Sequence, residues 1–138
     1  AIRATGQAQC WGHAGGGKTI PPAEDLFRSI TAGGDFSCGI REAGDLRCWG
    51  NDNVGQSTPP AGNDFASVYA GRRHACALRT SGDIRCWGAN EAGQVAAPTG
   101  TYVQLAAGTA HNCAVSESGD VDCWGNDAEG QSTAPDYP

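Results

Sequence analysis

The sequence predicts an all-β protein built from a short repeated unit. Its composition argues against a long helical bundle, because 21 of the 138 residues are Gly, 7 are Pro, none is Met and only 17% are charged. Seven cysteines are separated by gaps of 28, 10, 28, 10, 27 and 10 residues, and the triplet Cys-Trp-Gly occurs four times. Such an alternation indicates an internal repeat of 37–38 residues.

Every repeat shows the same order of elements. A loop rich in turn-forming residues follows Cys-Trp-Gly, and short apolar strands are expected at residues 26–30, 64–68 and 102–105. Each strand leads into Ala-Gly, two variable residues, an aromatic or His, and a Cys. We therefore divide the single domain 1–138 into a partial repeat 1–30 and the repeats 31–68, 69–105 and 106–138.

The ten-residue spacing of paired cysteines predicts a β-hairpin. Between Cys76 and Cys86 the turn is expected at Ser81-Gly82-Asp83, where Gly82 can supply a positive φ. Centring the hairpin on Ser81 places the two cysteines opposite each other on one face, because side chains alternate along a strand.

The other repeats follow the same rule, so three disulfides are predicted. They are Cys38–Cys48, Cys76–Cys86 and Cys113–Cys123. Zinc sites need cysteines two to four residues apart, which this spacing does not provide. Each bridge closes a small loop and is expected to stabilise the fold by about 2–3 kcal/mol. Disulfides at this density indicate an oxidising compartment, and hence a secreted or extracellular protein.

Cys10 is the unpaired cysteine. Residues 1–10 align with residues 39–48, which follow Cys38, so the partner of Cys10 is expected one position before Ala1. Two explanations remain open. The chain is a segment of a longer repeat protein, or its broken units are completed end to end by another copy, with Cys10 as the inter-chain link.

The repeated pattern of Ala-Gly-x-x-His/Phe-x-Cys, a Gly-Asp turn, Cys-Trp-Gly and Gly-Gln resembles the regulator-of-chromosome-condensation repeat. It is most similar to the short-repeat branch found in secreted bacterial propellers and in the ectodomains of crinkly-type plant receptor kinases. The resemblance implies a β-propeller, usually of seven blades with one short repeat per blade. This chain would supply about three complete blades and a partial one. Its open sheet edges would then need further blades or assembly.

The same resemblance implies a non-catalytic module that binds a protein or glycan partner. Binding is usually encoded in the loops that vary between repeats. The first variable set surrounds the slot after Ala-Gly: Asp35, Phe36, Arg72, Arg73, His74, Thr109 and His111. The second set follows Cys-Trp-Gly: Asp52, Asn53, Glu91 and Asp127. Arg72 and Arg73 could capture a carboxylate or sulfate, or could form a solvated turn.

Several of these residues have a structural alternative. Phe36, His74 and His111 share one repeat position, so packing is their other expected role. The four tryptophans also share one position and are expected to pack between adjacent blades: Trp11, Trp49, Trp87 and Trp124.

Two other functions are considered. The chain could be a structural subunit that assembles through its open ends into a filament or larger ring. It could also be an enzyme inhibitor, because one similar bacterial propeller inhibits β-lactamases. That propeller fills its slots with aromatic residues, whereas the only aromatic here is Phe36, just beyond the slot.

The remaining patterns predict no catalytic residue, metal site or cofactor. Gly12–Thr19 matches a phosphate-binding loop letter for letter, but Pro21 and Pro22 forbid the helix that such a loop requires. The Asn- and Asp-rich loops lack the spacing of a calcium loop. A net charge of −6 argues against nucleic-acid binding. No apolar run reaches the roughly 18 residues that predict a membrane span.

Overall fold

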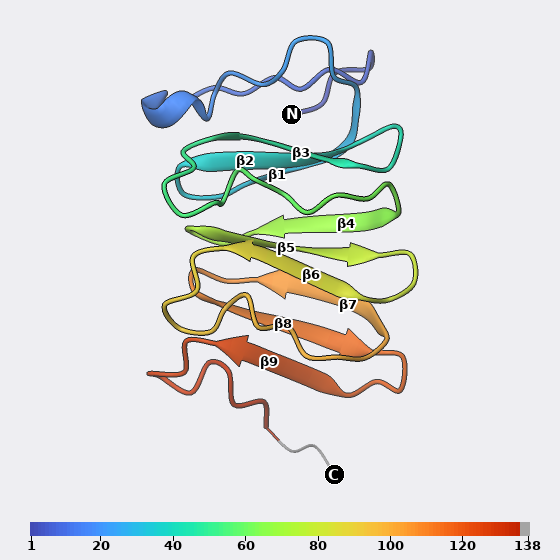
Figure 1. Ribbon diagram of the computed structural model, residues 1–138, viewed down its shortest axis with the longest axis vertical. Helices are drawn as coiled ribbons and strands as arrows, with labels where there is room; N and C mark the ends of the chain where they lie inside the picture. The colour runs from blue at the N-terminus through green and yellow to red at the C-terminus, as the bar shows by residue number, and fades with distance from the viewer. Residues whose placement is uncertain (136–138) are drawn as a thin grey trace.

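The computed structural model describes residues 1–135, which form three antiparallel three-stranded sheets (Figure 1). The sheets, here called blades 1 to 3, contain β1 (Phe27–Ala32), β2 (Phe36–Arg41) and β3 (Leu46–Gly50), then β4 (Phe65–Ala70), β5 (His74–Arg79) and β6 (Ile84–Gly88), and finally β7 (Tyr102–Ala107), β8 (His111–Ser116) and β9 (Val121–Gly125). They stack along the long axis of the molecule, and the N-terminal segment lies beyond blade 1. The all-β prediction is confirmed. The first strand of each blade runs two residues further than expected, to the Ala of Ala-Gly.

The hairpin between the second and third strands of each blade has the predicted register. All three predicted disulfides are formed: Cys38–Cys48, Cys76–Cys86 and Cys113–Cys123. The predicted turn was wrong by one residue. Because the Arg79 N–H donates to the Asp83 carbonyl at 2.9 Å, the loop is Thr80-Ser81-Gly82. Gly82 adopts the expected positive φ of 89°.

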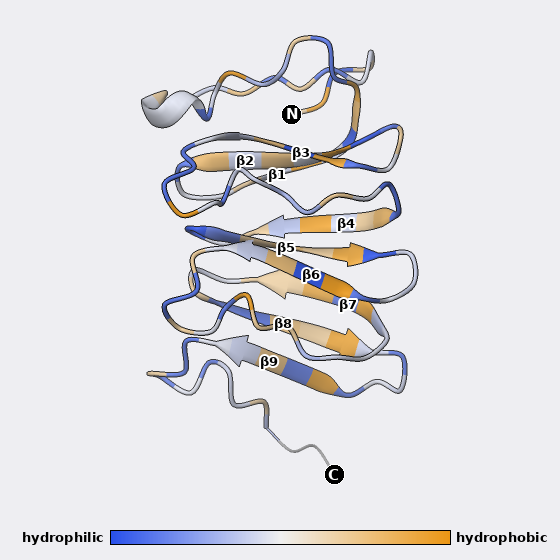
Figure 2. Cartoon of the chain, viewed as in Figure 1, coloured by the Kyte–Doolittle hydropathy of each residue, from blue (hydrophilic) through white to orange (hydrophobic). Residues whose placement is uncertain are grey.

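The hydrophobic core lies between the blades. Each blade has a leading face, which carries the disulfide, and a trailing face, which packs on the leading face of the blade before it. Figure 2 shows apolar residues along most strands. One core joins Phe36, Cys38, Ile40 and Leu46 to Phe65, Val68, Ala75, Ala77 and Trp87. The next joins Cys76, Leu78 and Ile84 to Tyr102, Leu105, Ala114 and Trp124. Burial at these interfaces holds the stack together.

Three tryptophan side chains form hydrogen bonds to the neighbouring unit. The indole N–H groups of Trp49, Trp87 and Trp124 donate to carbonyls in the loop of the preceding unit, at 3.0, 3.0 and 3.1 Å. These three side chains are only 7–9% exposed, whereas Trp11 is 73% exposed. The expected packing role is confirmed for three of the four tryptophans.

Residues 1–10 form a partial unit that precedes blade 1. Ile2 and Ala8 make an isolated antiparallel bridge. The carbonyl of Gly6 in this turn accepts a hydrogen bond from the Phe27 N–H at 2.7 Å. Two equivalent bonds join the later blades, from Phe65 to Gly44 and from Tyr102 to Gly82. The N-terminal hairpin therefore packs on blade 1 in the same way as the hairpin of blade 1 packs on blade 2.

The segment that matches a phosphate-binding loop has a different conformation from one. Gly15–Gly17 form a single 3-10 turn (η1), and no α-helix follows before β1 begins at Phe27. Within residues 1–135, no helix is long or apolar enough to cross a membrane.

Candidate binding edge

Both variable sets lie along one edge of the stacked blades. We call this the variable edge: it comprises turns 33–35, 71–73 and 108–110 and loops 51–53, 89–91 and 126–128. In an antiparallel sheet, the turn between the first two strands lies at the same end as the exit from the third strand. Hydrogen bonds of 2.8–2.9 Å join each loop to the turn of its own blade, for example from the Asn51 N–H to the Asp35 carbonyl.

The three turns are also joined to one another. The Gly34 N–H donates to the Arg72 carbonyl at 3.0 Å, and the Arg72 N–H donates to the Thr109 carbonyl at 3.1 Å. Gly is required at position 71, because a Cβ there would collide with the His74 ring and with the Gly108 carbonyl of the next blade. These close approaches create an open hollow of about 420 Å³ lined by the turns of all three blades.

Two ion pairs hold three of the charged residues at the edge. Lys18 lies 2.7 Å from Asp35 and also donates to the Gly34 carbonyl at 2.9 Å. The hydrogen bond and the charge of Lys18 lower the pKa of Asp35, with smaller contributions from His13 and Arg72. Arg73 and Glu91 form an ion pair of 3.0 Å, with both side chains about half exposed.

Arg72 is different. Its side chain is exposed, and among residues 1–135 it makes no ion pair. It extends from the middle blade, between the turns that carry Gly34 and Thr109. Arg72 is therefore a positive charge at the centre of the edge that is available to an acidic group.

Asp52 and Asp127 close their own loops. Asp52 accepts hydrogen bonds of 2.7 Å from the Ser57 N–H and the Thr58 hydroxyl. Asp127 accepts from Thr133 and Ser132 in the same way, at 2.8 and 2.7 Å, and the Thr133 hydroxyl is the main cause that lowers the pKa of Asp127. These carboxylates are exposed at the edge but already held in place.

The other loop and slot candidates are less constrained. Asn53 is exposed, and among its contacts with the described residues only its main-chain N–H is hydrogen-bonded, to the Asn51 side chain at 2.9 Å. Thr109 is also exposed and offers its hydroxyl at the end of the edge nearest blade 3. Both side chains could contact a partner directly.

Two predicted contact residues lie in the interior. Phe36 and His74 are completely buried, so the expectation that they touch a partner is wrong in this structure. Their rings lie against Gly33 and Gly71, which is the packing alternative. His111 occupies the equivalent place beside Gly108 but is only partly buried, on the leading face of blade 3.

Sequence reasoning missed Asn112. Its side chain is fully buried, its Oδ1 lies 2.9 Å from His74 Nε2, and its amide donates to the Gln94 carbonyl at 2.8 Å. Burial is the main cause that lowers the pKa of His74, and the hydrogen bond to Asn112 opposes it in part. The signal in the sequence was weak, because Ser37 and Ala75 stand at the same repeat position.

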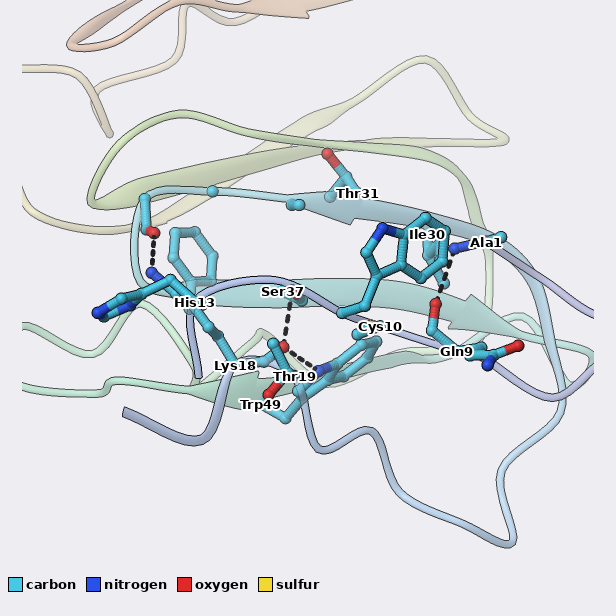
Figure 3. A pocket seen from close by; sticks show the side chains of 15 residues that line it. Ala1, Gln9, Cys10, His13, Lys18, Thr19, Ile30, Thr31, Ser37 and Trp49 are labelled. Atoms are coloured by element: carbon cyan, nitrogen blue, oxygen red, sulfur yellow. Dashed lines mark hydrogen bonds between the residues drawn. The ribbon is translucent and has the colours of Figure 1, made fainter. Parts of the chain in front are cut away.

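A cavity of about 500 Å³ lies between the N-terminal segment and blade 1 (Figure 3). Its lining includes Cys10, Trp11, Ile30, Ser37 and Trp49. Cys10 is a free thiol and is partly exposed. Within residues 1–135, no three His, Cys, Asp or Glu side chains gather as metal ligands would.

Comparison with known proteins agrees with this architecture. The family model of the regulator of chromosome condensation (RCC1) repeat matches residues 27–56, 65–94 and 102–131. No curated protein sequence matches the chain.

Solved structures are similar over most of the chain. The ectodomain of the receptor kinase CR4 from Physcomitrella patens is 26% identical, with a TM-score of 0.66, over 78% of this chain and 32% of that one. The CRINKLY ectodomain of the receptor kinase ACR4 from Arabidopsis thaliana is 30% identical, with a TM-score of 0.62, over 77% and 41%. A chain from the structure of Kap60 bound to yeast RCC1 (Prp20) is 19% identical, with a TM-score of 0.66, over 78% and 34%. The present chain thus spans only 32–41% of the length of these chains, and the partial-propeller fold is confirmed.

Proposed function

The chain belongs to the family of regulator of chromosome condensation (RCC1) repeats, and from this premise we propose that it is an extracellular module that binds a protein partner through its variable edge. Propellers of this family are typically protein-interaction modules. The observation that carries the proposal is Arg72, an exposed cation without an ion pair within residues 1–135, at the centre of turns contributed by three blades.

The exposed guanidinium of Arg72 favours a protein that presents an acidic group to the centre of the edge. Arg72 can bind a carboxylate in a bidentate manner, and Thr109, whose carbonyl accepts from the Arg72 N–H, adds a polar side chain beside it. A glycan is less favoured, because sugar-binding sites commonly use an exposed aromatic ring and the variable edge contains none. The burial of Phe36 also removes the one aromatic residue that would favour the β-lactamase-inhibitor alternative.

The extracellular location is supported by two observations. Each blade has one disulfide between its second and third strands, and such bridges persist in oxidising compartments. The plant relatives are described as ectodomains of receptor kinases.

The test is capture of secreted proteins on the immobilised chain with charge-reversed variants. Arg72→Glu is expected to abolish retention of the specific partner. Arg85→Glu is the matched control, because Arg85 is also exposed but lies on β6, away from the variable edge. Equal loss with both variants, or retention by Arg72→Glu, would contradict recognition through this edge.

End-to-end assembly is a second candidate function. It is favoured by the leading face of blade 3, where Val121 is 45% exposed although its equivalents Leu46 and Ile84 are only 7% and 8% exposed. A second unit packed there would bury this face as blades 2 and 3 bury the faces before them. Val121→Lys is expected to prevent concentration-dependent growth in light scattering, whereas Val103→Lys, on β7, leaves it unchanged.

A further inference from the structure

We propose that the hollow between the three turns of the variable edge binds a short extended segment of the partner chain, with an internal Asp or Glu whose carboxylate pairs with Arg72. This inference rests on the proposed function and narrows it. The acidic group then belongs to a linear segment that lies in the hollow, and not to a folded surface that touches the edge from outside.

The hollow is formed by three equivalent turns joined in a ladder. Gly34, Arg72 and Thr109 stand at the same repeat position. The first donates its main-chain N–H to the carbonyl of the second at 3.0 Å, and the second donates to the third at 3.1 Å. Main chains joined in this way lie about 4.8 Å apart, so the ladder extends over about 10 Å. An extended segment rises about 3.3 Å per residue, and about three residues therefore cover this length.

The lining of the hollow is small and carries one charge. Its volume is about 420 Å³, which lies within the range of roughly 300–1,000 Å³ that is usual for ligand pockets. Ala and Gly residues of all three blades line it, together with Arg72 and Thr109. Because Ala and Gly have the smallest side chains, another main chain can lie close to the turns. Among the described residues that line the hollow, Arg72 alone is charged.

The guanidinium of Arg72 is left to an external carboxylate. A Cβ at Gly34 would lie 3.1 Å from the Arg72 Cγ, which places the stem of the arginine beside the turn of blade 1. Asp35 follows in that turn, but its carboxylate is bound by Lys18 at 2.7 Å and makes no ion pair with Arg72. A carboxylate brought by the partner can therefore accept two parallel hydrogen bonds from the guanidinium.

The position of Arg72 favours an internal acidic residue over the end of a chain. The lining extends from Ala32 on blade 1 to Thr109 on blade 3, and Arg72 lies on the blade between them. A C-terminal carboxylate bound at Arg72 would leave one half of the hollow empty. An internal Asp or Glu lets the segment continue into both halves, where small neighbouring residues fit the Ala and Gly lining.

The test is a titration of the isotope-labelled chain with the pentapeptide Gly-Ala-Glu-Ala-Gly, acetylated and amidated at its ends, followed by two-dimensional NMR. The control peptide has Gln in place of Glu. We expect saturable shifts of the amide signals of Gly34, Arg72 and Thr109. The dissociation constant of the Glu peptide should be at least about tenfold lower than that of the Gln peptide. In Arg72→Gln, the two peptides should bind equally weakly.

A second variant places a competing carboxylate inside the hollow. Thr109 is exposed and its main chain is hydrogen-bonded to Arg72, so the side chain of Thr109→Glu can reach the guanidinium. This variant is expected to weaken binding of the Glu peptide by at least about tenfold. Thr109→Gln is the matched control, because it has the same size without the charge and should weaken binding less. Equal losses would contradict competition for Arg72.

Three further results would overturn the proposal. They are equal binding of the Glu and Gln peptides, shifts confined to the amide of Arg72, and tighter binding of the acetylated peptide Gly-Ala-Gly-Ala with a free C-terminal carboxylate. The last result would assign the hollow to a chain end.

Failure of this inference is distinguishable from failure of the proposed function. If the Glu peptide does not bind but Arg72→Glu still abolishes capture of the secreted partner, the edge recognises a folded surface. The inference is then wrong and the proposed function stands. If Arg72→Glu retains the partner, both are wrong.

Discussion

The Nε2 atom of His74 lies 2.9 Å from Oδ1 of Asn112, across the buried interface between blades 2 and 3. The Asn112 amide donates to the Gln94 carbonyl, so its Oδ1 faces the imidazole and accepts the Nε2–H. At the preceding interface, Phe36 and Ala75 occupy the equivalent positions. At each interface the two residues therefore have the same polarity: both are polar, or both are apolar.

This pairing predicts non-additive mutations. Asn112→Ala leaves the imidazole N–H buried without a partner and is expected to lower the free energy of unfolding by about 1–3 kcal/mol. The double variant His74→Phe with Asn112→Ala recreates the pair of the first interface and should recover much of that loss. Urea unfolding of the four proteins in the cycle measures the coupling. Strictly additive effects would show that the two side chains act independently.

The same histidine predicts a loss of stability on mild acidification. The pKa of His74 is lowered in the folded protein, mainly by burial, and its Nδ1 has no hydrogen-bond partner to share a second proton. The unfolded chain therefore binds the proton more readily, so stability is complete above the unfolded pKa of about 6.5 and falls as pH drops towards the lower folded pKa.

Thermal unfolding between pH 7 and pH 5 measures this effect. His74→Phe is expected to flatten the profile in this range. The aspartates with lowered pKa values act below this window, because their ordinary value is 3.8. An identical slope in the wild type and His74→Phe would refute the assignment.

The sequence was sufficient to predict the sheets and the disulfides, because both depend on local spacing. Alternation along a strand and a ten-residue hairpin fix Cys76 opposite Cys86 without knowledge of any other blade. The ion pair between Lys18 and Asp35, and the bond between His74 and Asn112, join different repeats. Their geometry depends on how blades stack, which no local pattern specifies. For the same reason, the position of Phe36 in the repeat did not show whether its side chain would be buried or exposed.

The tryptophans provide a comparison at one repeat position. Trp87→Phe removes the indole N–H that donates to the buried Gln56 carbonyl at 3.0 Å, and is expected to cost about 1–3 kcal/mol of stability. Trp11→Phe changes an exposed ring, so its effect should lie within about 0.5 kcal/mol. Urea unfolding followed by circular dichroism avoids the altered fluorescence. Similar losses in both variants would contradict a special role for the inter-blade bond.

The glycine that follows Ala in each first turn lets adjacent blades approach closely, because it has no side chain. A Cβ at Gly71 would lie 2.6 Å from the Gly108 carbonyl and would also overlap the buried His74 ring, neither of which can move without separating blades 2 and 3. Gly71→Ala is therefore expected to destabilise the protein by about 1–3 kcal/mol or more. Gly55→Ala is the matched control, because nothing lies within 4 Å of a Cβ there and only its φ of 77° opposes the change. That backbone strain alone should cost about 1–2 kcal/mol.

The steric and the backbone costs can be distinguished by adding His74→Ala to each variant, because this substitution makes room for a methyl group at position 71. In the His74→Ala background, Gly71→Ala should lower the free energy of unfolding by less than it does in the wild type, whereas the loss caused by Gly55→Ala should be the same. An equal change for both substitutions would show that the His74 ring does not limit the space at Gly71.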